Sequence, residues 1–434
     1  MTAYLEGGAA FIADIRGGGH MLMQKEKEIL RSLAGRYMDL AALPVQQEKI
    51  AMWKTLNAGS MTRPMVAVAL DQIPWHEFDS HELLRLHVAD PFWQQIERQL
   101  RQKLFQWAYF PVDMVIEPFI SIPMAVSGQH YGIEIQEETI ATDARNDIVS
   151  HCYKNQLEEE ADIAKIQDMR IVHDAAETAR RLESANEIFG GIAPVHTSGI
   201  QFHAGLWDFV TQFMGVENIY FDLMDRPEFM HQIMRRFTDA TVAGIKQANE
   251  LDVHDGNAKL CHGSYIYTNE FLPGPAKGKG GKSQNSWAFG LAQLFSSASP
   301  DITREFELPY IQEIAGYFGG LYYGCCERLD DRMELILQIP NLRKVSCSPW
   351  NDRDVFAEKI GPEFIMSAKP NPAFLAEKSV DYGAVEKDLR HTAEAARRNH
   401  VNLELILNAV STVRYDPARL TKWSEIAMHA VGGG

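Results

Sequence analysis

Cysteine is scarce in this sequence of 434 residues, which contains only five. Such a small, odd number argues against a disulfide framework and for reduced thiols. The cysteines are also unevenly placed, because four of the five fall between positions 261 and 347, and two are adjacent in GLYYGCCERLDD, 320 to 331. They are Cys152, Cys261, Cys325, Cys326 and Cys347.

Long apolar runs are absent. No stretch reaches the roughly 18 uninterrupted apolar residues that a membrane helix needs, and MTAYLEGGAAFIADIRGGGH at the start lacks the basic-then-apolar order of a signal peptide. We therefore expect a cytoplasmic protein that is not inserted in a membrane.

Positive charge is also in short supply. Lys and Arg total 42 against 58 Asp and Glu, and the formal net charge is -16. Binding to phosphate groups needs concentrated Lys and Arg. The charge balance thus disfavours nucleic acids and anionic membranes as partners and leaves a small molecule as the expected substrate.

Short apolar, β-branched runs recur along the chain, each followed by polar or Gly/Pro residues and then by a longer stretch with helical spacing. This alternation is typical of parallel strands joined by crossover helices. Eight such runs predict an α/β protein with a (β/α)8 TIM barrel. The predicted strands are 64–71, 113–120, 189–196, 258–263, 320–326, 343–348, 364–369 and 403–408.

The remaining segments suggest additions to the barrel. Residues 1–60 have helical spacing and predict an N-terminal helical extension, ahead of a barrel at 61–430. The interval 121–188 is too long for a minimal crossover and predicts an inserted cap, with an acidic helix in KNQLEEEADIAKIQDM. Pro, Gly and Lys in 271–286 predict a mobile loop, either a lid or a plain surface insertion.

Chemically useful side chains collect where the predicted strands end, and in a barrel these ends share one face. Imidazole, thiolate and carboxylate are zinc ligands, and three of them with one open position make a catalytic site. The preferred metal set is His262, Cys326 and Glu327. The alternatives stay open: His262 as a hydrogen-bonded structural histidine, and Glu327 as the ion-pair partner of Arg328.

Further residues at the same ends suit catalysis or substrate binding. The candidates for proton transfer are His76, Glu77, Glu117 and His196. Those for substrate binding are Asp71, Trp75, Tyr265, Tyr323, Trp350 and Lys369. A polar network at the barrel rim, or aromatic filling of the barrel mouth, would explain many of them equally well.

Several motifs together resemble the uroporphyrinogen decarboxylase superfamily, and most closely a branch of long, GCCE-containing members in anaerobic bacteria. They are GLYYGCCERLDD, NLRKVSCSPW, FIMSAKPNPA, STVRYDPARLTKW and GVENIYFDLMDRPEFMHQIM. The resemblance covers roughly residues 60 to 430. It implies a (β/α)8 barrel with one of two chemistries, which are cofactor-free decarboxylation and zinc-dependent methyl transfer to or from a corrinoid protein or a thiol.

Departures from the family patterns favour the second chemistry. The decarboxylases carry an arginine motif of the form MRQAGR, where this chain has RPMVAVALDQIPWHE. The methyltransferases hold zinc with a His-x-Cys pair and a distant cysteine, where this chain has Leu260, His262 and, near the end, Ser411. Cys326 and Glu327 would then restore the ligand set.

The resemblance therefore implies a zinc-dependent methyltransferase moving a methyl group between a small O- or N-methyl compound and a corrinoid carried by a partner protein. A cofactor-free decarboxylase or lyase of a small carboxylic acid is the alternative. A non-catalytic barrel that binds a corrinoid or porphyrin-like ligand is the third reading. The sequence leaves the oligomeric state open, a homodimer included.

Overall fold

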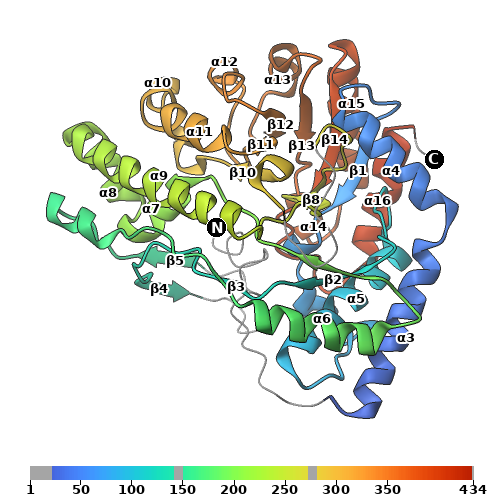
Figure 1. Cartoon of the computed structure of the whole chain (residues 1–434). Coiled ribbons are helices and arrows are strands. Elements are labelled where there is room, and N and C mark those ends of the chain that lie inside the picture. The colour runs from blue at the N-terminus through green and yellow to red at the C-terminus, as the bar shows by residue number, and fades with distance from the viewer. Residues whose placement is uncertain (1–21, 141–149, 272–280, 433–434) are drawn as a thin grey trace.

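The computed structural model describes residues 22–140, 150–271 and 281–432 (Figure 1). Its main feature is a six-stranded sheet with the order β1-β14-β13-β12-β11-β10, in which all neighbouring strands are parallel. The α/β class predicted from the sequence is confirmed. The strands of this sheet are β1 (Met65–Val68), β10 (Trp287–Gly290), β11 (Gly320–Tyr323), β12 (Leu342–Cys347), β13 (Ile365–Ala368) and β14 (Asn402–Leu407).

Both faces of this sheet are covered, as parallel sheets require. Every residue of β1, β11, β13 and β14 is buried. Figure 1 shows α10 to α13 and α15 along one side of the sheet, in orange and red. The helices that follow β9 are α10 (Pro300–Ile302), α11 (Leu308–Ala315), α12 (Met333–Ile336), α13 (Arg353–Ile360), α14 (Ala373–Ala376), α15 (Tyr382–Arg398) and α16 (Ala418–Ala430).

A smaller parallel sheet pairs β2 (Ile120–Pro123) with β7 (Val195–Ser198). The segments before β2 and after β7 contact the large sheet. Asp113 N donates to Val66 O at 3.0 Å, and His203 forms a parallel bridge to Phe289 in β10. Among the described residues these pairings form a six-stranded and a two-stranded ladder. They do not form one continuous eight-stranded ladder.

Three of the predicted strands differ in the structure. The strand expected at 189–196 forms only as β7, because the preceding helix extends to Phe189 and a turn follows it. The strand expected at 113–120 begins only at Ile120, because Pro118 has no N–H for a ladder and Asp113 uses its carboxylate to accept from Arg63 and from Val66 N. The strand expected at 258–263 is wrong as a member of the parallel sheet. Only β8 (Leu260–Cys261) forms there, antiparallel to β9 (Ser264–Tyr265), because His262 and Gly263 turn the chain with φ of 50° and 75°.

The place beside β11 is taken by β10, a strand that the sequence did not predict. Its four residues, WAFG, end in glycine and follow the predicted loop directly, so they lack the longer apolar run that marked the other strands. Most of that loop, 272–280, lies outside the described residues.

The described part of the N-terminal extension is helical, as predicted. It consists of α3 (Gln24–Ala41) and α4 (Pro44–Asn57), while residues 1–21 lie outside the described residues. The side chains of β1 alternate, so that Val66 and Val68 enter the larger apolar core and Met65 and Ala67 enter a second core beneath these helices. The extension therefore covers one face of the first strand.

The interval 121–188 is only partly as predicted. β4 (Glu137–Ile140) and β5 (Ser150–Tyr153) form an antiparallel pair beside α7, and 141–149 lies outside the described residues. The acidic helix predicted at 154–169 is wrong, since only the 3-10 turn η4 (Glu160–Lys165) forms there. Adjacent glutamates repel one another in a helix, and Asp162 instead accepts from the backbone of Glu158 and Glu159.

The other elements are β3 (Val126–Ser127), β6 (Val172–His173), α5 (Pro91–Tyr109), α6 (Ala175–Phe189), α7 (Leu206–Met214), α8 (Val216–Asp225) and α9 (Pro227–Glu250). Helix α9 confirms the helix expected at 227–251, with Pro227 in its first turn. No helix within the described ranges is both long and apolar enough to cross a membrane.

Candidate functional site

Lys369 lies at the centre of the polar residues that follow the parallel strands. It comes directly after β13 and is only 2% exposed. Its Nζ lies 3.5 Å from Ser367 Oγ and 5.1 Å from the ring centroid of Tyr322. Burial lowers the pKa of Lys369 to about 8, while electrostatic interactions with Glu404, Cys325 and Cys326 act in the opposite direction. The amine therefore titrates close to neutral pH.

Asp71 is an acid that interacts electrostatically with this lysine. It follows β1 in the short turn η1 (Leu70–Gln72) and remains exposed. Burial among surrounding protein atoms nevertheless raises its pKa, and its own backbone N–H, the Gln72 side chain and Lys369 partly offset the rise. Asp71 thus brings a carboxyl group within electrostatic reach of the Lys369 cation.

His262 occupies the turn between β8 and β9. Its ring stacks on Phe289, with centroids 4.1 Å apart, and meets Tyr322 edge-on at 5.3 Å. Burial, followed by the nearby Lys369 and His203, holds its pKa well below the ordinary value. The imidazole is therefore neutral at physiological pH. Because Lys369 acts on both His262 and Cys326, these two predicted ligands share one neighbourhood.

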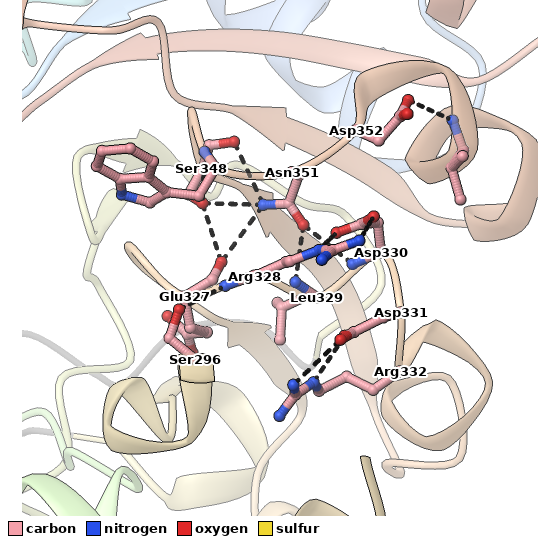
Figure 2. A network of polar contacts seen from close by, with 12 residues as sticks. Ser296, Glu327, Arg328, Leu329, Asp330, Asp331, Arg332, Ser348, Asn351 and Asp352 are labelled. Carbon is pink, nitrogen blue, oxygen red and sulfur yellow. Dashed lines mark hydrogen bonds and ion pairs between the residues drawn. The ribbon is translucent and has the colours of Figure 1, made fainter. Parts of the chain in front are cut away.

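The segment 324–332, which carries the two adjacent cysteines, is held by a polar network (Figure 2). Asn351 Oδ1 accepts from Leu329 N at 2.7 Å and Asp330 N at 3.0 Å, and its Nδ2 donates to Glu327 O at 3.3 Å. Ser348 Oγ donates to the same carbonyl at 3.0 Å. Residues after β12 thereby fix the loop after β11.

The carboxylate of Glu327 is used inside this loop. Its Oε2 accepts from Cys325 N at 2.7 Å and its Oε1 from Ala292 N at 3.4 Å, and the residue is 2% exposed. Within the described ranges no group of three or more His, Cys, Asp or Glu side chains is placed to hold a metal ion. The set His262, Cys326 and Glu327 therefore does not fit a metal in this arrangement, and zinc binding itself stays a prediction.

Buried acids lie next to the loop. Burial is the main cause of the raised pKa values of Asp208 and Glu307, and Glu327 adds to both. Glu307 accepts from Tyr323 Oη at 3.1 Å. Asp208 is 6% exposed, and its Oδ1 has no hydrogen-bond partner among the described residues. The repulsion between these groups favours the protonated form of Asp208.

Replacing Asp208 with asparagine is expected to stabilise the protein at pH 7.5 by about 1–3 kcal/mol. The pKa of Asp208 is higher in the folded protein than in the unfolded chain. Asp208 therefore destabilises the fold at pH values above the ordinary pKa of an aspartate. This destabilisation vanishes as the pH falls towards about 3.9. Urea unfolding at pH 7.5 and 4.5 measures the difference. The matched control is Asp239→Asn, in a surface ion pair 56% exposed. An Asp208→Asn variant that is less stable at both pH values would contradict the assignment.

The predicted residues after β1 mostly support the chain. Glu77 is 7% exposed and accepts from Val413 N at 2.8 Å and from Tyr415 N at 3.0 Å. Trp75 donates to Leu70 O at 2.7 Å and packs edge-on against Phe105. His76 lies edge-on to Tyr415, with centroids 6.4 Å apart. Glu77 and Trp75 thus hold the segments around β1 and β14.

The other predicted residues separate into different neighbourhoods. Tyr267 donates a hydrogen bond to Glu117, and Tyr265 Oη accepts from Val115 N at 3.0 Å. His196 is exposed and stacks on Phe119 at 4.3 Å. Trp350 is 74% exposed. Tyr323 bonds to one of the buried acids, Glu307. Of the predicted residues, Asp71, His262 and Cys326 interact electrostatically with Lys369.

Sequence reasoning missed a buried ion pair and its neighbours. Lys344 in β12 and Glu404 in β14 lie 2.7 Å apart, and both are fully buried. Charged residues inside the apolar runs RKVSCS and LELILN were the available signal. For His203, Asp208 and Glu307 there was no such signal, because none of them follows a predicted strand.

A separate surface hollow of about 290 Å³ lies beside Asn351. Its charged lining is already paired, since Arg353 bonds to Asp388, and His391 Nε2 lies 3.0 Å from Asp354. Lys369 does not line this hollow.

Comparisons with known proteins leave the family open. The chain matches no protein-family model, and no curated protein matches it in sequence. Its fold is similar to that of a methyltransferase from Methanosarcina mazei, with 11% sequence identity and a TM-score of 0.49, over 88% of this chain and 98% of the other. At these values the similarity carries no argument, and membership of the uroporphyrinogen decarboxylase superfamily stays a prediction.

Proposed function

We propose that this chain is a lyase that removes carbon dioxide from a small carboxylic acid without a cofactor. The observation that carries the proposal is the electrostatic interaction of a buried lysine, Lys369, with the solvent-accessible acid Asp71 where the parallel strands end. A carboxylate that leaves as carbon dioxide requires a cation for binding and a proton for the carbon that keeps the electron pair.

The ammonium group of Lys369 binds the substrate and stabilises the negative charge that develops when the carbon–carbon bond breaks. The electron pair stays on the substrate carbon, which requires an adjacent electron-accepting group such as a carbonyl. Asp71 gives its proton to that carbon, and it regains one from water because it is exposed. Neutral His262, whose ring stacks on Phe289, lies within electrostatic reach of the ammonium group.

A screen for carbon dioxide release tests the proposal. The full chain is incubated with small 2-oxo, 3-oxo and aryl carboxylic acids in the presence of a chelator, and carbon dioxide is measured by a coupled assay. Release from at least one acid, lost in Asp71→Asn, is the expected result. No release from any acid, or full activity in Asp71→Asn, would overturn the proposal.

Zinc-dependent methyl transfer with a corrinoid partner protein is the second candidate. The observation that favours it is the shared neighbourhood of His262 and Cys326 around Lys369. It requires a third ligand other than Glu327 in its described position. Zinc near one atom per chain, lost in Cys326→Ala, would support this candidate, and zinc-free active protein would remove it.

The two parallel sheets are taken, within this proposal, as parts of one (β/α)8 barrel. The hydrogen bond from Asp113 N to Val66 O and the bridge between His203 and Phe289 support this reading. Asp71 and Lys369 would then lie at the carboxyl-end mouth, where barrel enzymes place their chemistry.

A further inference from the structure

Cys325 and Cys326 bring their sulfur atoms close together without forming a disulfide bond. The two Sγ atoms lie 3.3 Å apart, about 1.3 Å more than the length of a disulfide bond. Cys325 is fully buried, whereas Cys326 is partly exposed. A reagent from solvent therefore reaches Cys326 first, with Cys325 directly behind it.

The surrounding structure holds the pair in this position. Cys325 N donates to Glu327 Oε2 at 2.7 Å, and Cys325 O accepts from Ser346 Oγ at 2.8 Å. Gly324 precedes them at φ +91°, and a Cβ at that position would come within 2.7 Å of Leu329 Cδ1. The backbone on both sides of the thiols is thus fixed by residues from β12 and from the loop itself.

Groups of both charge signs surround the pair. Lys369 lies close enough to interact electrostatically with both cysteines, and Asp208 with Cys326. A neighbouring cation stabilises a thiolate, which is the nucleophile in thiol–disulfide exchange. The proposed lyase reaction uses neither thiol, so this chemistry is independent of it.

We propose that Cys325 and Cys326 form a redox-active vicinal dithiol that a small-molecule disulfide oxidises to an intramolecular disulfide. The Cys326 sulfur attacks the external disulfide, whose S–S bond breaks and releases one thiol. The Cys325 sulfur then attacks Cys326, displaces the second thiol and passes its proton to it. Two electrons move from the pair to the external disulfide, which ends as two thiols.

The resulting bond is expected to be easily reversed. Adjacent Cα atoms are only about 3.8 Å apart across a trans peptide, below the roughly 4.4–6.8 Å that unstrained disulfides span. Strain raises the reduction potential, and labile disulfides of this kind respond to the redox state of their surroundings. The pair therefore suits a reversible modification better than a permanent cross-link.

Oxidised glutathione tests the proposal on the full chain. Reduced protein is treated anaerobically, quenched with acid and analysed by intact mass and peptide mapping. The expected product is about 2 Da lighter, with the bond between Cys325 and Cys326, and dithiothreitol restores the starting mass. Cys152→Ser, which removes the exposed cysteine, is the matched control and should form the same bond between Cys325 and Cys326.

Two single variants separate the roles of the sulfurs. In Cys325→Ser, Cys326 should retain one glutathione as a stable mixed disulfide, because nothing displaces it. In Cys326→Ser, the buried Cys325 should stay unmodified. Wild-type protein that retains glutathione at Cys326, or that stays reduced at 325 and 326 while Cys152 reacts, would overturn the proposal.

Discussion

Replacing Lys369 with methionine is expected to lower kcat/KM at least about 100-fold for the acid that the screen identifies, because a charge aimed at the transition state acts strongly in a dry site. Methionine keeps the length and packing of the side chain while removing its charge. Steady-state carbon dioxide release measures the effect. The matched control is Lys246→Met, on the exposed part of α9, which should retain full activity.

The pH dependence provides an independent test of the same residue. The pKa of Lys369 is lowered to about 8, so the ammonium form dominates below that pH and is lost above it. Since kcat/KM reports the free enzyme, it should fall as the pH rises through about 8. Lys369→Arg keeps its charge at high pH and should lose this fall. A wild-type profile that rises through pH 8 would point to a neutral amine and contradict the assigned role.

Replacing Lys344 with methionine is expected to destabilise the protein by about 3–5 kcal/mol, since it leaves the buried charge of Glu404 without its partner. Lys344 Nζ donates to Glu404 Oε2 at 2.7 Å, to Ser264 Oγ at 2.6 Å and to Tyr265 O at 3.1 Å. The second carboxylate oxygen, Glu404 Oε1, is also buried and has no hydrogen-bond partner among the described residues. Guanidinium unfolding measures the loss.

The double variant Lys344→Met, Glu404→Gln separates charge from packing. Removing the second charge should recover most of the lost stability, because an uncharged pair of similar volume avoids the cost of burying one ion alone. Lys422→Met is the control, since its ion pair with Glu425 is more than half exposed and should contribute less than about 1 kcal/mol. If the double variant is as unstable as the single one, packing around β12 and β14 is responsible.

Local patterns were enough for five of the six strands of the large sheet and for part of the site. The strands β11 to β14 were predicted because fully buried strands require continuous apolar runs, and this requirement is readable from neighbouring residues alone. The positions of Asp71, Cys326 and Lys369 near the ends of parallel strands followed from the same pattern. His262 instead lies in the turn between β8 and β9, where a parallel strand was expected. Strand β10 was missed because WAFG is too short to stand out from the loop before it.

The sequence by itself determined the α/β class, the helices of the N-terminal extension, helix α9 and the kinds of side chain that gather after the strands. Only the tertiary structure decided how those side chains are used. The carboxylates of Glu77 and Glu327 accept hydrogen bonds from backbone N–H groups. Lys369 interacts electrostatically with Glu404 of β14 and with the two cysteines that follow β11. The physical reason is that apolar periodicity is local, whereas hydrogen-bond partners and burial come from residues far apart in the chain.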